Sequence, residues 1–153
     1  MTTEILVRVI DCHVVFRTSA PQYLMLKRAD HKQYPGIWQC VTGRVKVDEK
    51  PYQTALRELA EETALKPVSM WTVDQINLFY EAMEDRVNLI PIFGVEVAND
   101  QVRLSDEHVD HRWCSVEEAV DLLLWDQQKM GLTAFHKMLT EKSPKLTFSR
   151  IPL

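Results

Sequence analysis

Three carboxylates lie close together in one short segment, TALRELAEET, which spans residues 54–63. Glu58, Glu61 and Glu62 stand at positions i, i+3 and i+4, so an α-helix would bring all three onto one face. The opposite face would pack on a sheet, and it carries Leu56, Leu59, Ala60 and Thr63. Like charges at this spacing destabilise a helix by roughly 0.2–0.5 kcal/mol per pair. Two explanations stay open: a solvated acidic surface, or a site for a hard divalent cation such as Mg²⁺, which binds oxygen ligands.

Length and composition limit the classes of protein to consider. The 153 residues are enough for one domain with its own core, and we expect residues 1–153 to form a single domain. The net charge of −4 disfavours polymeric nucleic acid as a partner, although a small phosphorylated molecule can bind where the local charge is positive. The chain has no apolar run long enough for a transmembrane helix, and its N-terminus lacks the pattern of a secretory signal. Three widely spaced cysteines, Cys12, Cys40 and Cys114, argue against a disulfide framework. We therefore expect a cytoplasmic protein that contacts no membrane.

Several apolar stretches predict strands. Runs rich in β-branched and aromatic residues cover residues 5–16, 23–29, 38–47, 68–82 and 88–98. Pro91 inside the last run indicates an edge strand or a bulge. Residues 104–111, LSDEHVDH, are expected to form a polar loop.

Helical patterns follow these strands along the chain. Pro51 lies where a first helical turn would begin, and Pro67 closes the pattern, which predicts a helix over residues 51–63. A Ser-x-x-Glu capping box predicts a second helix over residues 116–124, and a third is expected over residues 126–141. The order strands, helix, strands, helices indicates an α+β fold with a mixed or antiparallel sheet between helices.

The segment that precedes the acidic helix makes the metal explanation more specific. From Gly43 the sequence runs through five residues to Glu49 and through seven more to Arg57-Glu58-Leu59, and Glu61 and Glu62 follow. This spacing resembles the Nudix box, GX5EX7REUXEEXGU, in which U is an apolar residue. One specified position differs: Ala64 stands where the pattern has glycine. Because glycine there ends the helix with a positive φ, alanine would cost about 1 kcal/mol or force a different exit.

The resemblance implies a Nudix-like α/β/α sandwich with a mixed β-sheet between helices. It also implies a bound Mg²⁺ (or Mn²⁺) and attack by water on a phosphorus atom. Carried onto this chain, Glu58 and Glu62 would be the principal metal ligands, and Glu61 would be a further ligand or a base acting through water. The carbonyl of Thr42 would complete the ligand set. Arg57 would orient a glutamate, for which Glu49 is the candidate. Glu49 and Gly43 would support the metal ligands without contacting the metal themselves.

Residues outside the Nudix box are further candidates. The family often draws another carboxylate from a distant loop, and Glu107 is the best candidate for this role, as a ligand and as a catalytic group. Asp106 is a weaker competitor for the metal. His108 and His111 could act as a general base or contact phosphate, or be merely exposed loop residues.

The approach to the box, WQCVTG, resembles the branch that cleaves dATP or dihydroneopterin triphosphate to a monophosphate and pyrophosphate. Arg28 or Lys27 could bind the triphosphate as a cation, and Thr42 could also contact substrate. Trp38 could stack on a base or belong to the core. Further candidates for a base pocket are Tyr34, Phe79 and Tyr80. The alternatives are hydrolysis of dinucleoside polyphosphates, nucleotide sugars or oxidised nucleotides, and a catalytically silent nucleotide-binding module. A homodimer stays open.

Overall fold

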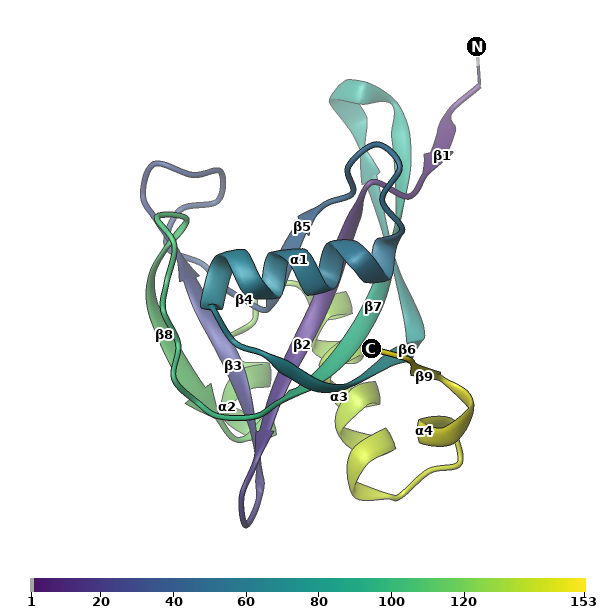
Figure 1. Cartoon of the computed structure of the whole chain (residues 1–153). Coiled ribbons are helices and arrows are strands. Elements are labelled where there is room, and N and C mark those ends of the chain that lie inside the picture. Colours follow the sequence, from purple (N-terminus) through teal and green to yellow (C-terminus); the bar gives the residue numbers. More distant parts are fainter. Residues whose placement is uncertain (1) are drawn as a thin grey trace.

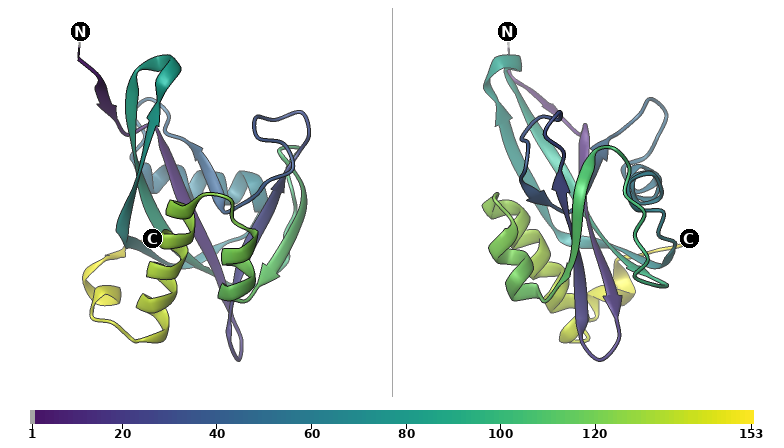
Figure 2. Two further views of the ribbon diagram at one scale, coloured as in Figure 1. Left: turned by 180° about the vertical axis from the view of Figure 1, so that it is seen from behind. Right: turned by 90° about the vertical axis from the view of Figure 1, so that its left-hand side faces the viewer.

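A mixed β-sheet separates one helix from the others, as Figures 1 and 2 show. The computed structural model describes residues 2–153. The strands are β1 (Glu4–Leu6), β2 (Val9–Arg17), β3 (Pro21–Arg28), β4 (Trp38–Gln39), β5 (Val41–Arg44), β6 (Pro67–Glu81), β7 (Arg86–Val97), β8 (His108–Cys114) and β9 (Arg150–Ile151). The helices are α1 (Pro51–Thr63), α2 (Val116–Leu122), α3 (Asp126–Thr140) and α4 (Lys145–Phe148), with a 3₁₀ turn, η1 (Ala82–Glu84).

The sheet combines parallel and antiparallel pairs, so the predicted mixed sheet is confirmed. Its strand order is β4-β3-β2-β7-β6-β9, with β1 paired to β7, β5 to β2 and β8 to β3. Strand β7 runs parallel to both β1 and β2, and every other pair is antiparallel. Helix α1 covers one face of the sheet and α2 and α3 cover the other (Figure 2, right). The architecture is therefore the expected α/β/α sandwich.

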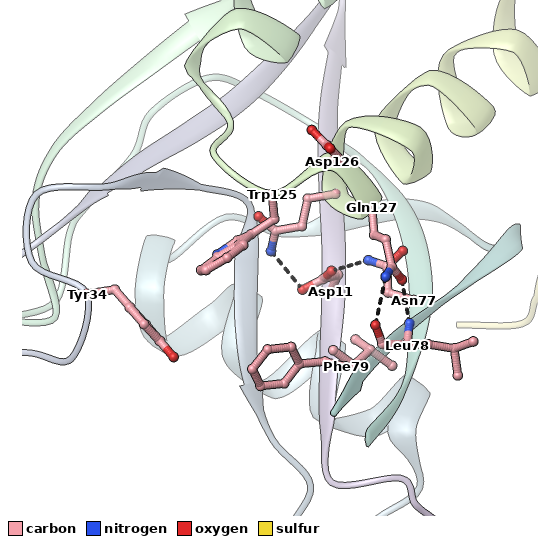
Figure 3. A pocket seen from close by; sticks show the side chains of 10 residues that line it. Asp11, Tyr34, Asn77, Leu78, Phe79, Trp125, Asp126 and Gln127 are labelled. Atoms are coloured by element: carbon pink, nitrogen blue, oxygen red, sulfur yellow. Dashed lines mark hydrogen bonds between the residues drawn. The ribbon is translucent and has the colours of Figure 1, made fainter. Parts of the chain in front are cut away.

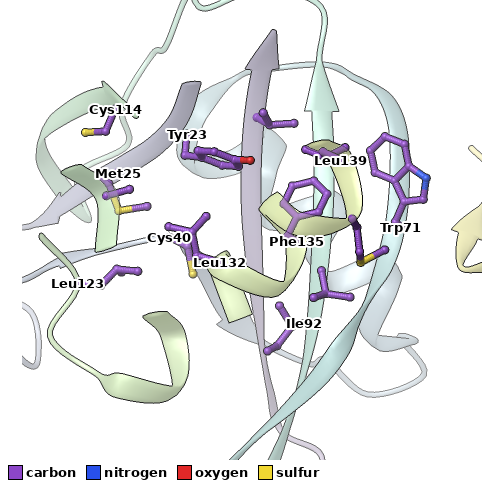
Figure 4. Close-up of a cluster of buried hydrophobic side chains, with 14 residues drawn as sticks. Tyr23, Met25, Cys40, Trp71, Ile92, Cys114, Leu123, Leu132, Phe135 and Leu139 are labelled. Atoms are coloured by element: carbon purple, nitrogen blue, oxygen red, sulfur yellow. The ribbon is translucent and has the colours of Figure 1, made fainter. Parts of the chain in front are cut away.

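Each face of the sheet has its own buried cluster, because successive side chains of a strand point to opposite faces. Cys12 and Val14 of β2 pack on the α1 side together with Leu59 of that helix. Val15 of β2 belongs to the opposite cluster, which Phe135 of α3 fills (Figure 4). Burial on both faces fixes the register, since a one-residue slip would exchange the two sets.

Helix α1 begins and ends as the sequence predicts. Pro51 opens it, and the Gln53 side chain accepts a 2.9 Å hydrogen bond from the Lys50 backbone N–H in front of the first turn. At the other end Ala64 adopts φ 60° and donates its backbone N–H to Ala60 O at 2.9 Å. Alanine thus takes the left-handed conformation that glycine adopts at lower cost, and the helix exit is unchanged.

Three predictions about the elements are wrong in detail, and two short elements were missed. The expected strand over residues 5–16 is two strands, because β1 and β2 pair with separate stretches of β7 and β2 also pairs with β5. The expected loop 104–111 ends earlier, because pairing with β3 draws His108 and its successors into β8. Helix α2 stops at Leu122 rather than at residue 124. The two C-terminal elements α4 and β9 were not predicted; both are very short.

Other expectations hold. Pro91 lies in the internal strand β7, opposite an irregularity of β6 between Thr72 and Ile76, which is the bulge alternative. The three cysteines are buried and free. Within residues 2–153, no helix has the length and apolar character needed to span a membrane.

Candidate functional site

The glutamates of α1 approach the backbone of β5 so closely that a glycine is needed there. A Cβ atom added at Gly43 would lie 2.2 Å from Cγ and 2.4 Å from Oε1 of Glu58. Gly43 therefore leaves the space in which the Glu58 carboxylate rests beside the strand. Thr42, the preceding residue, lines a surface groove that Gly43 and Glu58 also line.

Arg57 lies at the centre of the acidic cluster. Its guanidinium donates to both carboxylate oxygens of Glu49, at 2.8 and 3.0 Å, and to the backbone oxygen of Arg44 at 2.9 Å. The same side chain reaches Glu58 at 2.7 Å and Glu61 at 3.2 Å. This bidentate pairing lowers the pKa of Glu49 to about 2. Arg57 thus links the loop that carries Glu49 to the helix.

Glu62 has the most unusual environment of the acidic residues. It is 2% exposed, and its Oε2 has no hydrogen-bond partner within residues 2–153. Burial, with Glu58 and Glu107 nearby, raises the pKa of Glu62 to about 9. A buried carboxylate without a partner is costly, and a bound cation is one of the few ways to retain its charge.

Residues from two elements come together at Glu62. Single ligand atoms of Glu62, Glu107 and His108 lie within 4.8 Å of one another. Glu58 is not a member of this group of three. His108 is buried and lies 2.9 Å from Gln39 Nε2, and burial with Arg28 and Lys32 nearby lowers the pKa of His108 to about 4. The imidazole is therefore neutral near pH 7, the form that binds metal.

These residues fit a divalent cation. Glu62 and Glu107 offer carboxylate oxygens, the ligands that Mg²⁺ and Mn²⁺ prefer, and a neutral imidazole adds a nitrogen. Glu61 has a different environment: its side chain is 56% exposed and is paired with Arg57. The arrangement therefore offers Glu62 and Glu107 as direct ligands, with Glu58 and Glu61 at its edge.

A groove of about 620 Å³ lies beside the acidic cluster and is rich in basic side chains. The basic residues that line it are Arg8, Arg28, Lys32, Arg44 and Arg86, and the acidic ones are Asp11, Glu58, Glu81 and Glu107. Glu81 pairs with both Arg8 and Arg86. Carboxylates beside several guanidinium groups form an environment suited to a phosphate chain with its counter-ion.

Several predicted candidates lie elsewhere. Arg28 lines the groove, but Lys27 does not. Trp38 packs against the buried apolar cluster beneath α2 and α3, and the Arg112 guanidinium lies 4.9 Å from its ring centroid. Tyr80 is exposed and donates a hydrogen bond to Asp85. Neither Asp106 nor His111 lines the groove.

A second cavity, of about 390 Å³, adjoins the groove (Figure 3). Tyr34 and Phe79, both predicted as candidates for a base pocket, line it together with Trp125. Asp11 lies at its inner end and accepts hydrogen bonds from Asn77 at 2.9 Å and from Gln128 at 3.2 Å. Sequence reasoning missed these polar residues, although a carboxylate within the apolar run ILVRVIDCHVVF was a visible signal.

Comparisons with known proteins agree with the fold and the site. The NUDIX domain family model matches residues 7–134. The bis(5'-nucleosyl)-tetraphosphatase [asymmetrical] of Mus musculus is 30% identical over 124 residues, which cover 79% of this chain and 82% of that protein. The dihydroneopterin triphosphate diphosphatase of Haemophilus influenzae is 30% identical over 121 residues, with 71% and 75% covered. A crystal structure described as a NUDIX hydrolase from Listeria monocytogenes superposes with a TM-score of 0.75 at 27% identity, covering 88% of this chain and 94% of that one.

Proposed function

The chain belongs to the NUDIX domain family and is a pyrophosphohydrolase of nucleotide-like substrates, and from that premise we propose that it is a Mg²⁺-dependent enzyme that cleaves a nucleoside triphosphate-like compound to a monophosphate and pyrophosphate. Mn²⁺ would serve in place of Mg²⁺. The substrates of this proposal are of the dATP or dihydroneopterin triphosphate type.

One observation carries the proposal. Glu62 is a buried carboxylate with an unpartnered oxygen, and it lies beside Glu107, which lines a groove together with several guanidinium groups. A bound cation would stabilise the charged form of this carboxylate, and the basic side chains of the groove would bind phosphate oxygens. A triphosphate with Mg²⁺ would supply both partners at once.

In this proposal each residue of the site has its own role. Glu62 and Glu107, with Glu58 and the carbonyl of Thr42, would hold the cation, which when bound neutralises phosphate oxygens and lowers the pKa of coordinated water. Arg28 would bind the phosphate chain at the Glu107 side of the groove.

Two further residues would act through their neighbours. Arg57 would fix the orientation of Glu58 through its 2.7 Å contact and would itself be held by Glu49. Exposed Glu61 is placed to exchange a proton with solvent and would act as base through a water molecule.

A second candidate function is hydrolysis of dinucleoside polyphosphates. The groove carries further cations, Arg8, Arg44 and Arg86, in addition to Arg28 and Lys32. That set could accommodate a longer phosphate chain, and the mouse relative is a tetraphosphatase by name. A silent binding module is the third alternative, and the intact acidic set from Glu58 to Glu62 disfavours it.

The test is product analysis on a substrate panel with and without Mg²⁺. The panel contains dATP, dihydroneopterin triphosphate, 8-oxo-dGTP and diadenosine tetraphosphate. Metal-dependent release of pyrophosphate from a triphosphate supports the proposal. Formation of two nucleotides from the tetraphosphate alone favours the second candidate, and no turnover of any compound overturns both. Glu62→Gln should be inactive in the same assay, and Glu141→Gln, an exposed residue at the end of α3, is the matched control.

A further inference from the structure

The cavity beside the groove has a polar inner end and an aromatic rim. Tyr34, Phe79 and Trp125 each keep between 42% and 45% of their surface exposed around it. The rings of Tyr34 and Trp125 meet edge to face, with centroids 5.8 Å apart. Figure 3 shows Asp11 between the Trp125 and Phe79 side chains. Aromatic side chains left exposed around a cavity provide faces on which a flat heterocycle can stack.

The polar groups at the inner end are arranged as acceptors. Asn77 and Gln128 direct their N–H groups to the two oxygens of Asp11. An ionised carboxylate has about four lone-pair directions, so Asp11 keeps one free on each oxygen. Asn77 Oδ1 and Gln128 Oε1 are buried and find no partner in the described part of the chain, residues 2–153.

The other polar neighbours of Asp11 are engaged or lie at the rim. Gln127 uses its side-chain amide on the backbone N–H and C=O of Leu78. The rim carries two donors, the Tyr34 hydroxyl and the Trp125 indole N–H, beside the exposed acid Asp126. A ligand edge that reaches Asp11 at the inner end must therefore bring hydrogen-bond donors, and an edge that presents its own acceptors would face Asp11 unfavourably.

We infer that this cavity, here named the amino-edge pocket (Asp11, Tyr34, Asn77, Phe79, Trp125 and Gln128), selects rings that present a ring N–H beside an exocyclic amino group. Guanine and 2-amino-4-oxo pteridines share this edge, and its two parallel donors match the two oxygens of a carboxylate. Adenine presents a donor beside an acceptor on each of its edges, and uracil presents an N–H flanked by two carbonyls. The inference rests on the proposed function, because it names the base of the substrate that the adjoining groove would cleave.

The first experiment compares two ligands that differ only in the exocyclic amino group. Binding of GMP and of IMP to the full chain is measured by titration calorimetry without added metal. We expect GMP to bind at least about tenfold more tightly than IMP, within the range for a good bidentate base contact. Equal dissociation constants, or no binding of either nucleotide, overturn the inference.

Two matched variants then assign the contact. Asp11→Asn should abolish the preference for GMP, and Asp121→Asn, the same change at an exposed residue of α2 outside the cavity, should retain it. A preference that survives in Asp11→Asn, or that disappears in Asp121→Asn instead, overturns the assignment to Asp11. If Asp11→Asn fails to fold, the comparison of GMP with IMP on the unmodified chain still decides.

The proposed reaction and the proposed selectivity of the pocket can be refuted independently of each other. Hydrolysis of triphosphates without a preference for GMP over IMP leaves the proposed function standing and overturns the pocket. A clear preference for GMP in a protein that hydrolyses no triphosphate leaves the pocket standing and overturns the proposed reaction.

Discussion

Replacement of Gly43 by alanine tests the geometry of the metal site with one methyl group. The added Cβ would lie 2.2 Å from Cγ, 2.3 Å from Cδ and 2.4 Å from Oε1 of Glu58. Non-bonded carbon atoms rest at about 3.5–4.0 Å, so the Glu58 carboxylate must move by roughly 1 Å or more. Arg57 holds Oε1 at 2.7 Å, and the movement disturbs that contact as well. A misplacement of about 1 Å costs about 100-fold in rate, and we expect kcat/KM of Gly43→Ala to fall by about that factor.

The assay is metal-dependent pyrophosphate release at several Mg²⁺ concentrations, with the melting temperature as a check of folding. The Mg²⁺ concentration that gives half-maximal rate should rise together with the loss of kcat/KM. Gly36→Ala is the control: its Cβ would meet no atom within 4 Å, and its φ of 77° predicts only a loss of stability of about 1 kcal/mol. A folded Gly43→Ala variant with normal kcat/KM and normal Mg²⁺ dependence would refute the reasoning that Glu58 must rest against this strand.

Three shorter predictions concern other positions. Glu62→Gln should lower kcat by about 10³-fold or more, and Mg²⁺ should raise the melting temperature of the unmodified protein but not of the variant; an equal rise in both contradicts the assignment. Ala64→Gly should raise the free energy of unfolding in urea by about 0.5–1 kcal/mol, because φ is 60° there; an unchanged midpoint would show that alanine is unstrained. His13 is buried, and burial lowers its pKa from 6.5 in the unfolded chain to about 3, so the unfolded chain binds the extra proton and stability falls as pH drops from 6.5 towards 3. His13→Leu should make that fall shallower in urea titrations across this range, and parallel curves for the two proteins would contradict it.

The features that sequence reasoning predicted are local ones. Helix α1 was predicted because its proline, its glutamate spacing and its apolar face all lie within thirteen residues. The resemblance to the Nudix box implied a pairing of Arg57 with Glu49, two residues of one short motif, and the structure joins them at 2.8 Å. In these cases the residues are so close in sequence that secondary structure alone determines where their side chains lie.

The features that were missed depend on strand pairing. His108 was assigned to the same loop as Glu107, and it lies in a strand because β8 pairs with β3 opposite Arg28, whereas Glu107 remains in the turn before that strand. Asp11 meets partners 66 and 117 residues away, a contact that no local pattern contains. For Trp38 the sequence left base stacking and the core open, and strand pairing decides for the core, because Trp38 packs beneath α2 and α3.

The crowding of glutamates on α1 has two different compensations. Glu58 and Glu61, the more accessible pair, share the guanidinium of Arg57, so a cation from the chain itself offsets much of their repulsion. Glu62 receives no such contact, and burial raises its pKa to about 9, so this group is neutral near pH 7 unless a cation lies beside it. Of the three glutamates, Glu62 is therefore the one whose charge depends on an external cation. A divalent ion bound there would displace the proton and hold Glu62 in its charged form.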